Sequence, residues 1–232
     1  MIVYLKSILA ILKENMSFLF TYCLIFLAFF LYYFMNNKGD EIYFLNSFHS
    51  DTNDILFKFS SDFAEGIYYA LILIILGMFS FKFLFNGVLT YLISGGVTQI
   101  LKRIFDFPRP KLFFGSEILA NLHLVEGVKI YTKYSFPSGH STAAFSMMFF
   151  LSLIVPNKYA KILFAIFAAI MGISRIYLVQ HFLVDVIVGS VVGIVVTLLT
   201  YKFVLSQRKI VNSKWYNFSV IEKIYKRKYE NE

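Results

Sequence analysis

The sequence predicts an all-α, polytopic membrane protein: a bundle of six transmembrane helices preceded by an interfacial helix. Of its 232 residues, 58% are hydrophobic and 16% are charged, and the mean hydropathy is +0.67. A soluble domain is typically about 45–50% apolar and about 25% charged, so the composition argues strongly against a water-soluble globule. The apolar residues also lie in continuous runs, whereas the strands of a membrane barrel would alternate apolar with polar residues. Helices are therefore the expected element.

The chain divides into three expected parts. Residues 1–16 mix apolar residues with Lys6, Lys13 and Glu14, a pattern typical of an amphipathic helix lying in the membrane interface. Residues 206–232 form a basic tail that we expect to be cytoplasmic. Between them, residues 17–205 hold the six apolar runs, each long enough or nearly so to cross a hydrocarbon core of about 30 Å. The runs are Ser17–Met35, Ile67–Phe85, Gly87–Leu101, Gly139–Pro156, Tyr159–Leu178 and Phe182–Leu205.

Two of the connections between these runs are long, residues 36–66 and 102–138. Long loops in a compact domain are usually functional or disordered. The aromatic residues within 111–136 are compatible with a lid over a lipid substrate and equally with ordinary interface aromatics. His49 and His123 lie in these connections and are expected to be solvated.

The charge distribution predicts the orientation. With a cytoplasmic N-terminus, the inner segments carry 13 basic and 4 acidic residues, and the outer segments carry 9 basic and 10 acidic residues. Because Lys and Arg are enriched on the cytoplasmic side, we expect both termini to be cytoplasmic. In a bacterium the protein would lie in the plasma (inner) membrane with its outer loops facing the periplasm or the cell exterior. The net charge of +8 is thus explained without a nucleic-acid partner, and no feature of the sequence indicates an oligomeric state.

Polar and charged residues collect where the expected spans reach the outer face. The third and fifth spans end there and the fourth and sixth begin there, so residues from four helices are expected to meet. Ionisable groups beside membrane spans are costly and tend to be functional. The residues are, in chain order, Lys102, Arg109, Ser138, Gly139, His140, Arg175, His181 and Asp185.

Part of this set predicts an anion site. Lys102, Arg109 and Arg175 are cations, and arginine forms forked hydrogen bonds with phosphate oxygens. The helix start at Ser138 and Gly139 offers free backbone N–H groups and the positive end of the helix dipole. A metal site made from the histidines and Asp185 is a competing interpretation, but the three cations would repel a divalent ion.

The two histidines of the set add reactivity. His181 and Asp185 are four residues apart and share one helix face. Asp185 would accept the proton-bearing nitrogen of His181 and leave the other nitrogen as a nucleophile. His140, on another helix, is available to protonate the departing oxygen.

Three segments together resemble the three-part signature of the type 2 phosphatidic acid phosphatase superfamily. The first begins at Lys102 and ends in Arg109-Pro110; the second is Pro137-Ser-Gly-His140; the third runs from Ser174-Arg175 through His181 to Asp185. The spacing of all three agrees with the family pattern. With the six spans, the resemblance covers approximately Ile67–Leu205.

The resemblance implies a phosphatase without metal or other cofactor. In the family's mechanism the counterpart of His181 attacks phosphorus to form a phosphohistidine, that of Asp185 orients it, and that of His140 protonates the leaving group. Water then hydrolyses the phosphohistidine. The family's phosphate-binding positions fall on Lys102, Arg109, Ser138, Gly139 and Arg175.

The expected substrate is a phosphomonoester or pyrophosphate of a lipid, because the site is made from helix ends beside the bilayer. The compact six-span form is similar to bacterial members of the family acting on phosphatidate, phosphatidylglycerol phosphate, undecaprenyl pyrophosphate or lipid A, and an outward-facing site favours the last two. One alternative is a vanadate-dependent haloperoxidase, which shares the anion site; six spans argue against it. Another is a non-catalytic protein that binds lipid phosphates, which would not require both His140 and His181 with Asp185.

Overall fold

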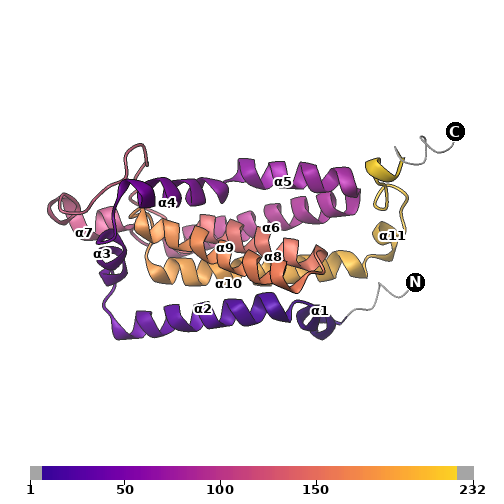
Figure 1. Cartoon of the computed structure of the whole chain (residues 1–232), viewed down its shortest axis with the longest axis horizontal. Helices are drawn as coiled ribbons and strands as arrows, with labels where there is room; N and C mark the ends of the chain where they lie inside the picture. The colour runs from indigo at the N-terminus through magenta and orange to yellow at the C-terminus, as the bar shows by residue number, and fades with distance from the viewer. Residues whose placement is uncertain (1–6, 224–232) are drawn as a thin grey trace.

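The computed structural model describes residues 7–223, all of which lie in helices or in the loops and turns between them. Figure 1 shows α2, α5, α6, α8, α9 and α10 along the long axis of the molecule. The helices are α1 (Ile8–Glu14), α2 (Met16–Met35), α3 (Asp40–Asn46), α4 (Asp51–Phe63), α5 (Gly66–Phe79), α6 (Phe81–Phe105), α7 (Pro110–Leu119), α8 (Gly139–Ile154), α9 (Lys158–Tyr177), α10 (Leu183–Ser206) and α11 (Arg208–Val211).

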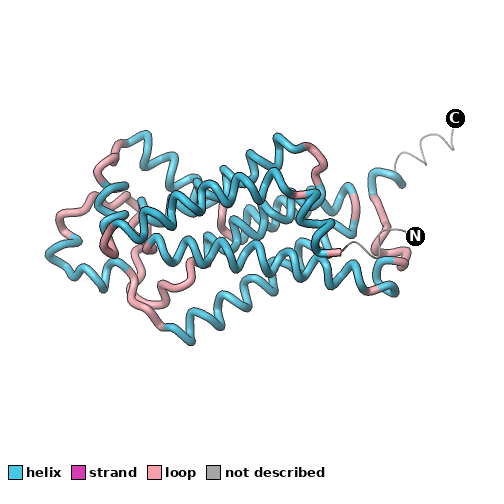
Figure 2. Tube along the Cα trace, turned by 90° about the horizontal axis from the view of Figure 1, so that it is seen from below, coloured by secondary structure: helices cyan, strands magenta, loops and turns pink. Residues whose placement is uncertain are grey.

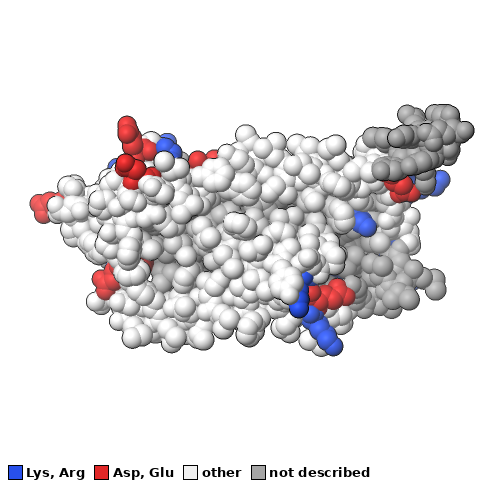
Figure 3. All heavy atoms as spheres, in the orientation of Figure 1, with Lys and Arg blue, Asp and Glu red and all other residues white. Residues whose placement is uncertain are grey.

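The described helices include four that are long and apolar enough to cross a membrane, namely α2, α6, α9 and α10. A fifth candidate is the pair α4 and α5, which is bent by 59°. Helix α8 is apolar but has only 16 residues. Figure 3 shows the Lys, Arg, Asp and Glu side chains of this face near the two ends of the long axis, with an uncharged band between them. Four to five spans and this band agree with the expected membrane protein.

The predicted boundary between the second and third runs is wrong. The sequence suggested a break near Asn86, but α5 ends at Phe79, Ser80 is extended (φ −161°, ψ 132°), and α6 continues to Phe105. Apolar residues flank Ser80 on both sides, so hydropathy carries no signal of the turn. Asn86 and Gly87 lie buried within α6.

The two long connections are partly helical. Residues 36–66 contain α3 and α4, and residues 102–138 contain α7. Ser50 starts α4 as its N-cap, with its hydroxyl accepting a hydrogen bond from the amide of Asn53 at 3.2 Å. Figure 2 shows long stretches of loop gathered at the end of the bundle that carries α3 and α7.

The ends of the chain are described only in part. The predicted interfacial helix, residues 1–16, corresponds to α1, which Ser7 caps by accepting from the amide of Ala10 at 3.2 Å; residues 1–6 lie outside the described range. The predicted tail contains α11, and its residues 224–232 also lie outside that range. Both α1 and α11 lie at the end of the bundle opposite α3 and α7 (Figure 1).

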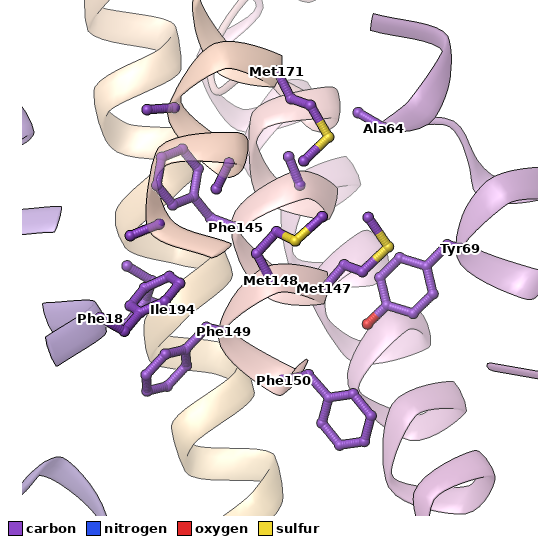
Figure 4. Close-up of a cluster of buried hydrophobic side chains, with 14 of the residues drawn as sticks. Phe18, Ala64, Tyr69, Phe145, Met147, Met148, Phe149, Phe150, Met171 and Ile194 are labelled. Atoms are coloured by element: carbon purple, nitrogen blue, oxygen red, sulfur yellow. The ribbon is translucent and has the colours of Figure 1, made fainter. Parts of the chain in front are cut away.

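Helix α8 forms the centre of the bundle and packs against α6, α9 and α10. Its side chains point towards several neighbouring helices (Figure 4), with Phe149 and Phe150 among the fully buried residues. Phe149 meets Phe18 of α2 at a ring-centroid distance of 5.1 Å. A helix with apolar residues on nearly every face is stable only when it is surrounded by others, which explains the central place of this short helix.

Two glycines set the distance between α8 and α10. A Cβ atom on Gly189 would lie 2.6 Å from the carbonyl oxygen of Ser138, and one on Gly193 would lie 2.5 Å from that of Thr142. Small residues four apart allow helix backbones to approach closely. The same approach places the amide of Ser138 at 3.0 Å from the carbonyl oxygen of Asp185. The two helix starts are therefore joined backbone to backbone.

Candidate active site

The sequence-predicted site residues all lie at the end of the bundle that carries α3 and α7. Lys102 lies in the last turn of α6, and Arg109 precedes α7. Ser138 is the N-cap of α8, and Arg175 lies in the last turn of α9. His181 and Asp185 flank the start of α10, while Gly139 and His140 form the first residues of α8.

His181 and Asp185 form a buried pair. The Nδ1 atom of His181 lies 3.2 Å from Oδ2 of Asp185, and the two side chains are 1% and 2% exposed. The same oxygen accepts from the hydroxyl of Ser135 at 2.5 Å and from the amide of Phe182 at 3.0 Å. Since a carboxylate can only accept, this pairing leaves Nε2 of His181 with its lone pair.

The surroundings keep His181 neutral. Burial, reinforced by the positive charges of Arg109, Lys102 and Arg175, holds the pKa of His181 well below its ordinary range. A neutral imidazole is the nucleophilic form, so the charges that attract an anion also keep the lone pair available.

The start of α8 supplies hydrogen-bond donors. Ser138 is fully buried, and its hydroxyl accepts from the amide and hydroxyl of Ser141 at 3.3 and 2.9 Å. The N–H groups of Gly139 and His140 have no acceptor among the described residues. Unpaired amides at a helix N-terminus bind anions, so this turn is suited to a phosphate group.

Arg175 has a free hydrogen-bonding atom in a buried position. Its side chain donates to the hydroxyl of Ser61 on α4, and it is 6% exposed. Its Nε is buried and has no partner within the described part of the chain. An unpaired buried donor is costly, and a phosphate oxygen would satisfy it.

Lys102 and Arg109 are held by the loop that precedes α8. The ammonium group of Lys102 donates to the carbonyl oxygen of Tyr134 at 2.5 Å. Arg109 donates through Nε to the carbonyl oxygen of Lys133 at 2.9 Å, and through a terminal nitrogen to the backbone and side-chain oxygens of Gln180, both at 3.2 Å. These contacts fix the two cations beside His181.

His140 lies at the mouth of a groove with a volume of about 550 Å³. The groove runs between the start of α5, the middle of α6 and the first turns of α8, and its lining includes Glu65, Tyr91, Gly95, Gly96 and Ala143. Nε2 of His140 lies 3.9 Å from Oε1 of Glu65. The groove therefore reaches the start of α8 at Gly139 and His140 and extends from there along the helices.

Several residues of this region escaped the sequence interpretation. Ser135 precedes the second motif and Gln180 lies within the third, but neither has chemistry that marks it out. Ser61 and Glu65 come from α4 and from the α4–α5 junction, where no motif is present. Glu41 of α3 is buried and accepts from the amide of Leu183 at 2.9 Å, which satisfies a donor at the start of α10.

Of the two histidines expected to be solvated, His49 is exposed, whereas His123 is partly exposed and paired with a carboxylate. Its Nε2 lies 2.7 Å from Oδ2 of Asp54, and its side chain is 34% exposed. The ring of His49 stacks on that of His123 with a centroid distance of 4.5 Å. The sequence could not show this pairing because His123 and Asp54 are 69 residues apart.

Among the described residues, no group of three or more His, Cys, Asp or Glu side chains is arranged to hold a metal ion. The donors that surround His181 are cations and backbone amides, which suit an anion.

The sequence of this chain is similar to one protein family and to several characterised proteins. The sequence profile of the PAP2 superfamily matches residues 83–209. A lipid A 4'-phosphatase of Porphyromonas gingivalis is 39% identical over 83 residues, which are 36% of this chain and 34% of that protein. Phosphatidylglycerophosphatase B of Bacillus subtilis is 30% identical over 139 residues, 55% of this chain and 62% of that protein. The alignments thus span less than two thirds of either relative.

The crystal structure of LpxE from Aquifex aeolicus is also similar. It has a TM-score of 0.62 and 25% sequence identity, and the match covers 71% of this chain and 94% of that one. The arrangement of helices is therefore shared over most of the solved structure.

Proposed function

Because this chain belongs to the PAP2 superfamily, whose profile covers more than half of it, we propose that it is a multi-pass membrane phosphatase that hydrolyses a lipid phosphomonoester or pyrophosphate. The candidate substrates are undecaprenyl pyrophosphate, lipid A, phosphatidate and phosphatidylglycerol phosphate. Two relatives are a lipid A 4'-phosphatase and a phosphatidylglycerophosphatase, which supports a lipid as substrate.

The observation that carries the lipid assignment is the groove beside His140. Tyr91, which lines the groove, and Lys102 are 11 residues apart on α6. This separation corresponds to about 16 Å along the helix axis at 1.5 Å per residue. Most of the groove's lining surface is apolar. A headgroup bound among the cations can therefore leave its chain in the groove and in the bilayer.

The proposed topology has six spans within residues 17–205, with the bent pair α4 and α5 as one span and the short α8 as another. Residues 1–16 are the interfacial helix and 206–232 the cytoplasmic tail. The basic excess near the termini supports a cytoplasmic position for both, and α1 and α11 lie at the same end of the bundle (Figure 1). The active site then faces the periplasm or the cell exterior.

In the proposed first step, Nε2 of His181 attacks phosphorus. The P–N bond forms as the P–O bond to the lipid breaks, and His140 gives its proton to the departing oxygen. Asp185 fixes the ring of His181 and stabilises the positive charge that develops on it. Arg175, Arg109, Lys102 and the amides at Gly139 bind the phosphoryl oxygens, and Ser138 holds that turn.

In the second step, His140 accepts a proton from water, and the water oxygen attacks phosphorus. The P–N bond breaks, inorganic phosphate leaves, and His181 returns to its neutral form. The cycle needs no metal or other cofactor, because protein cations and amides carry the charge stabilisation.

The decisive test of the function is phosphate release from purified protein in detergent. The four lipids would be compared by kcat/KM with a short, water-soluble phosphomonoester. We expect at least one lipid to exceed the soluble ester by about 100-fold, since binding energy from the chain contributes to transition-state stabilisation. Equal turnover of the soluble ester would contradict a lipid substrate, and absence of all phosphate release would contradict the phosphatase.

The groove makes a separate prediction. A Cβ atom on Gly95 would meet nothing within 4 Å, so Gly95→Leu is expected to fold, with a gain in helix propensity, and to fill part of the groove. We expect kcat/KM for the lipid to fall about tenfold, while that for the soluble ester is unchanged. Val88→Leu, on the same helix but outside the groove lining, is the control. Unchanged lipid turnover in Gly95→Leu would contradict the groove as the chain site.

Inhibitors test the chemistry. Vanadate forms a five-coordinate adduct that resembles the transition state of phosphoryl transfer, so we expect it to inhibit competitively and to bind more tightly than phosphate. EDTA is expected to leave the rate unchanged. A loss of activity in EDTA that one divalent metal restores would overturn the metal-free mechanism.

A further inference from the structure

Glu65 occupies an unusual position in the backbone. It lies at the break between α4 and α5, where the helix axis turns by 59°. Glu65 is extended (φ −78°, ψ 157°) and is the N-cap residue of α5, but its side chain makes no capping hydrogen bond. The carboxylate is directed instead towards His140, with 3.9 Å between Oε1 and Nε2. Both residues line the same groove.

The charges around His140 make this carboxylate chemically important. Positive groups face the imidazole from several elements: Lys102 from α6, Arg109 from the loop before α7, Arg175 from α9, and His181 from the loop before α10 when protonated. Among the described residues, Glu65 is the one acidic side chain within 4.0 Å of His140. Glu65 also acts on Arg175, as does the nearby Asp62, whereas Asp185 acts on Arg109. A general acid must carry a proton before it can donate it, and cations oppose that protonation.

We propose that Glu65 is a positioning residue for His140: its carboxylate, at an ion-pair distance of 3.9 Å in this structure, moves to hydrogen-bond distance when the imidazole is protonated. It then accepts the Nε2–H and leaves Nδ1 to face the leaving oxygen. The proposal rests on the phosphatase reaction described above. In this arrangement the two histidines are held by carboxylates through opposite ring nitrogens. Asp185 holds Nδ1 of His181 and frees Nε2 for attack, whereas Glu65 holds Nε2 of His140 and frees Nδ1 for proton transfer.

The proton balance is simple. As the P–O bond breaks, the proton on Nδ1 of the imidazolium moves to the lipid oxygen, and the imidazole keeps its Nε2–H. As water attacks, Nδ1 takes the proton back. Glu65 touches neither phosphorus nor the transferred proton.

The experiment measures Glu65→Gln, Glu65→Asp and a matched control, Glu117→Gln, which removes an exposed carboxylate from α7 at the same end of the bundle. Each is assayed across pH with the preferred lipid and with p-nitrophenyl phosphate, whose leaving group needs little protonation. For Glu65→Gln we expect kcat on the lipid to fall about tenfold with KM unchanged, and the alkaline limb of the pH profile to move about half a unit lower. On the aryl phosphate we expect less than about a twofold loss.

Glu65→Asp keeps the charge and is expected to restore part of the alkaline limb, and Glu117→Gln is expected to behave as the wild type. Equal losses on both substrates would show a merely structural role for Glu65. Wild-type kinetics in Glu65→Gln would also overturn the proposal.

A second readout does not depend on turnover. The chain has 4 histidines, so the ¹⁵N-histidine spectrum is small, and His140→Gln identifies the signal of His140. That signal should titrate at lower pH in Glu65→Gln than in the wild type. If the wild type releases no phosphate, the proposed function fails, but this shift would still support the pairing. An unchanged titration would refute the pairing whatever the activity.

Discussion

Replacement of His181 by alanine is expected to lower kcat by about 10⁴-fold or more, because in the proposed mechanism it removes the atom that bonds to phosphorus. The remaining cations and amides would still bind phosphate, so KM should change far less than kcat. The measurement is single-turnover phosphate release with the preferred lipid.

Detection of the covalent intermediate distinguishes loss of the nucleophile from misfolding of the variant. Acid quenching of wild-type protein with ³²P-labelled substrate should give an acid-labile, alkali-stable phosphohistidine, and His181→Ala should give none. His49→Ala, at an exposed histidine of the same end of the bundle, is the matched control and should retain both label and turnover. Labelling of His181→Ala at the wild-type level would place the nucleophile elsewhere.

Arg175→Lys is the second substitution with a large expected effect. Lysine keeps the positive charge but not the forked geometry that binds two phosphoryl oxygens at once, nor the contact with Ser61 in its present form. We expect kcat/KM to fall about 100-fold, as for loss of a donor to a developing oxyanion. The reduction should appear mainly in kcat if the contact strengthens in the transition state.

The control for Arg175→Lys is Arg103→Lys, the same chemical change at an exposed arginine of α6. It should leave kinetics unchanged. Turnover of Arg175→Lys at the level of the wild type would contradict a direct role for the guanidinium. Thermal unfolding of both variants would show whether the buried position tolerates lysine.

The sequence predicted those parts of the molecule that depend on local pattern. The apolar runs located the long helices, and the motif spacings placed His181 near Asp185 and both near the start of α8. It could not predict the turn at Ser80, because apolar residues surround it. It also missed contacts between segments far apart in the chain: Arg175 with Ser61 over 114 residues, and Leu183 with Glu41 over 142. Such contacts depend on how the loops fold back over the bundle, which periodicity does not encode.

The direct contact of α10 with α8 at Gly189 and Gly193 has a consequence for which parts of the site can move. At this contact the backbones leave no space for a side chain, and the amide of Ser138 donates to the carbonyl oxygen of Asp185. In the proposed reaction, the nucleophile and the phosphate-binding turn would therefore keep their distance. On the other side, the groove beside His140 is bounded by α6 and by the break between α4 and α5. When a lipid enters, we expect displacement at that break and not between α8 and α10.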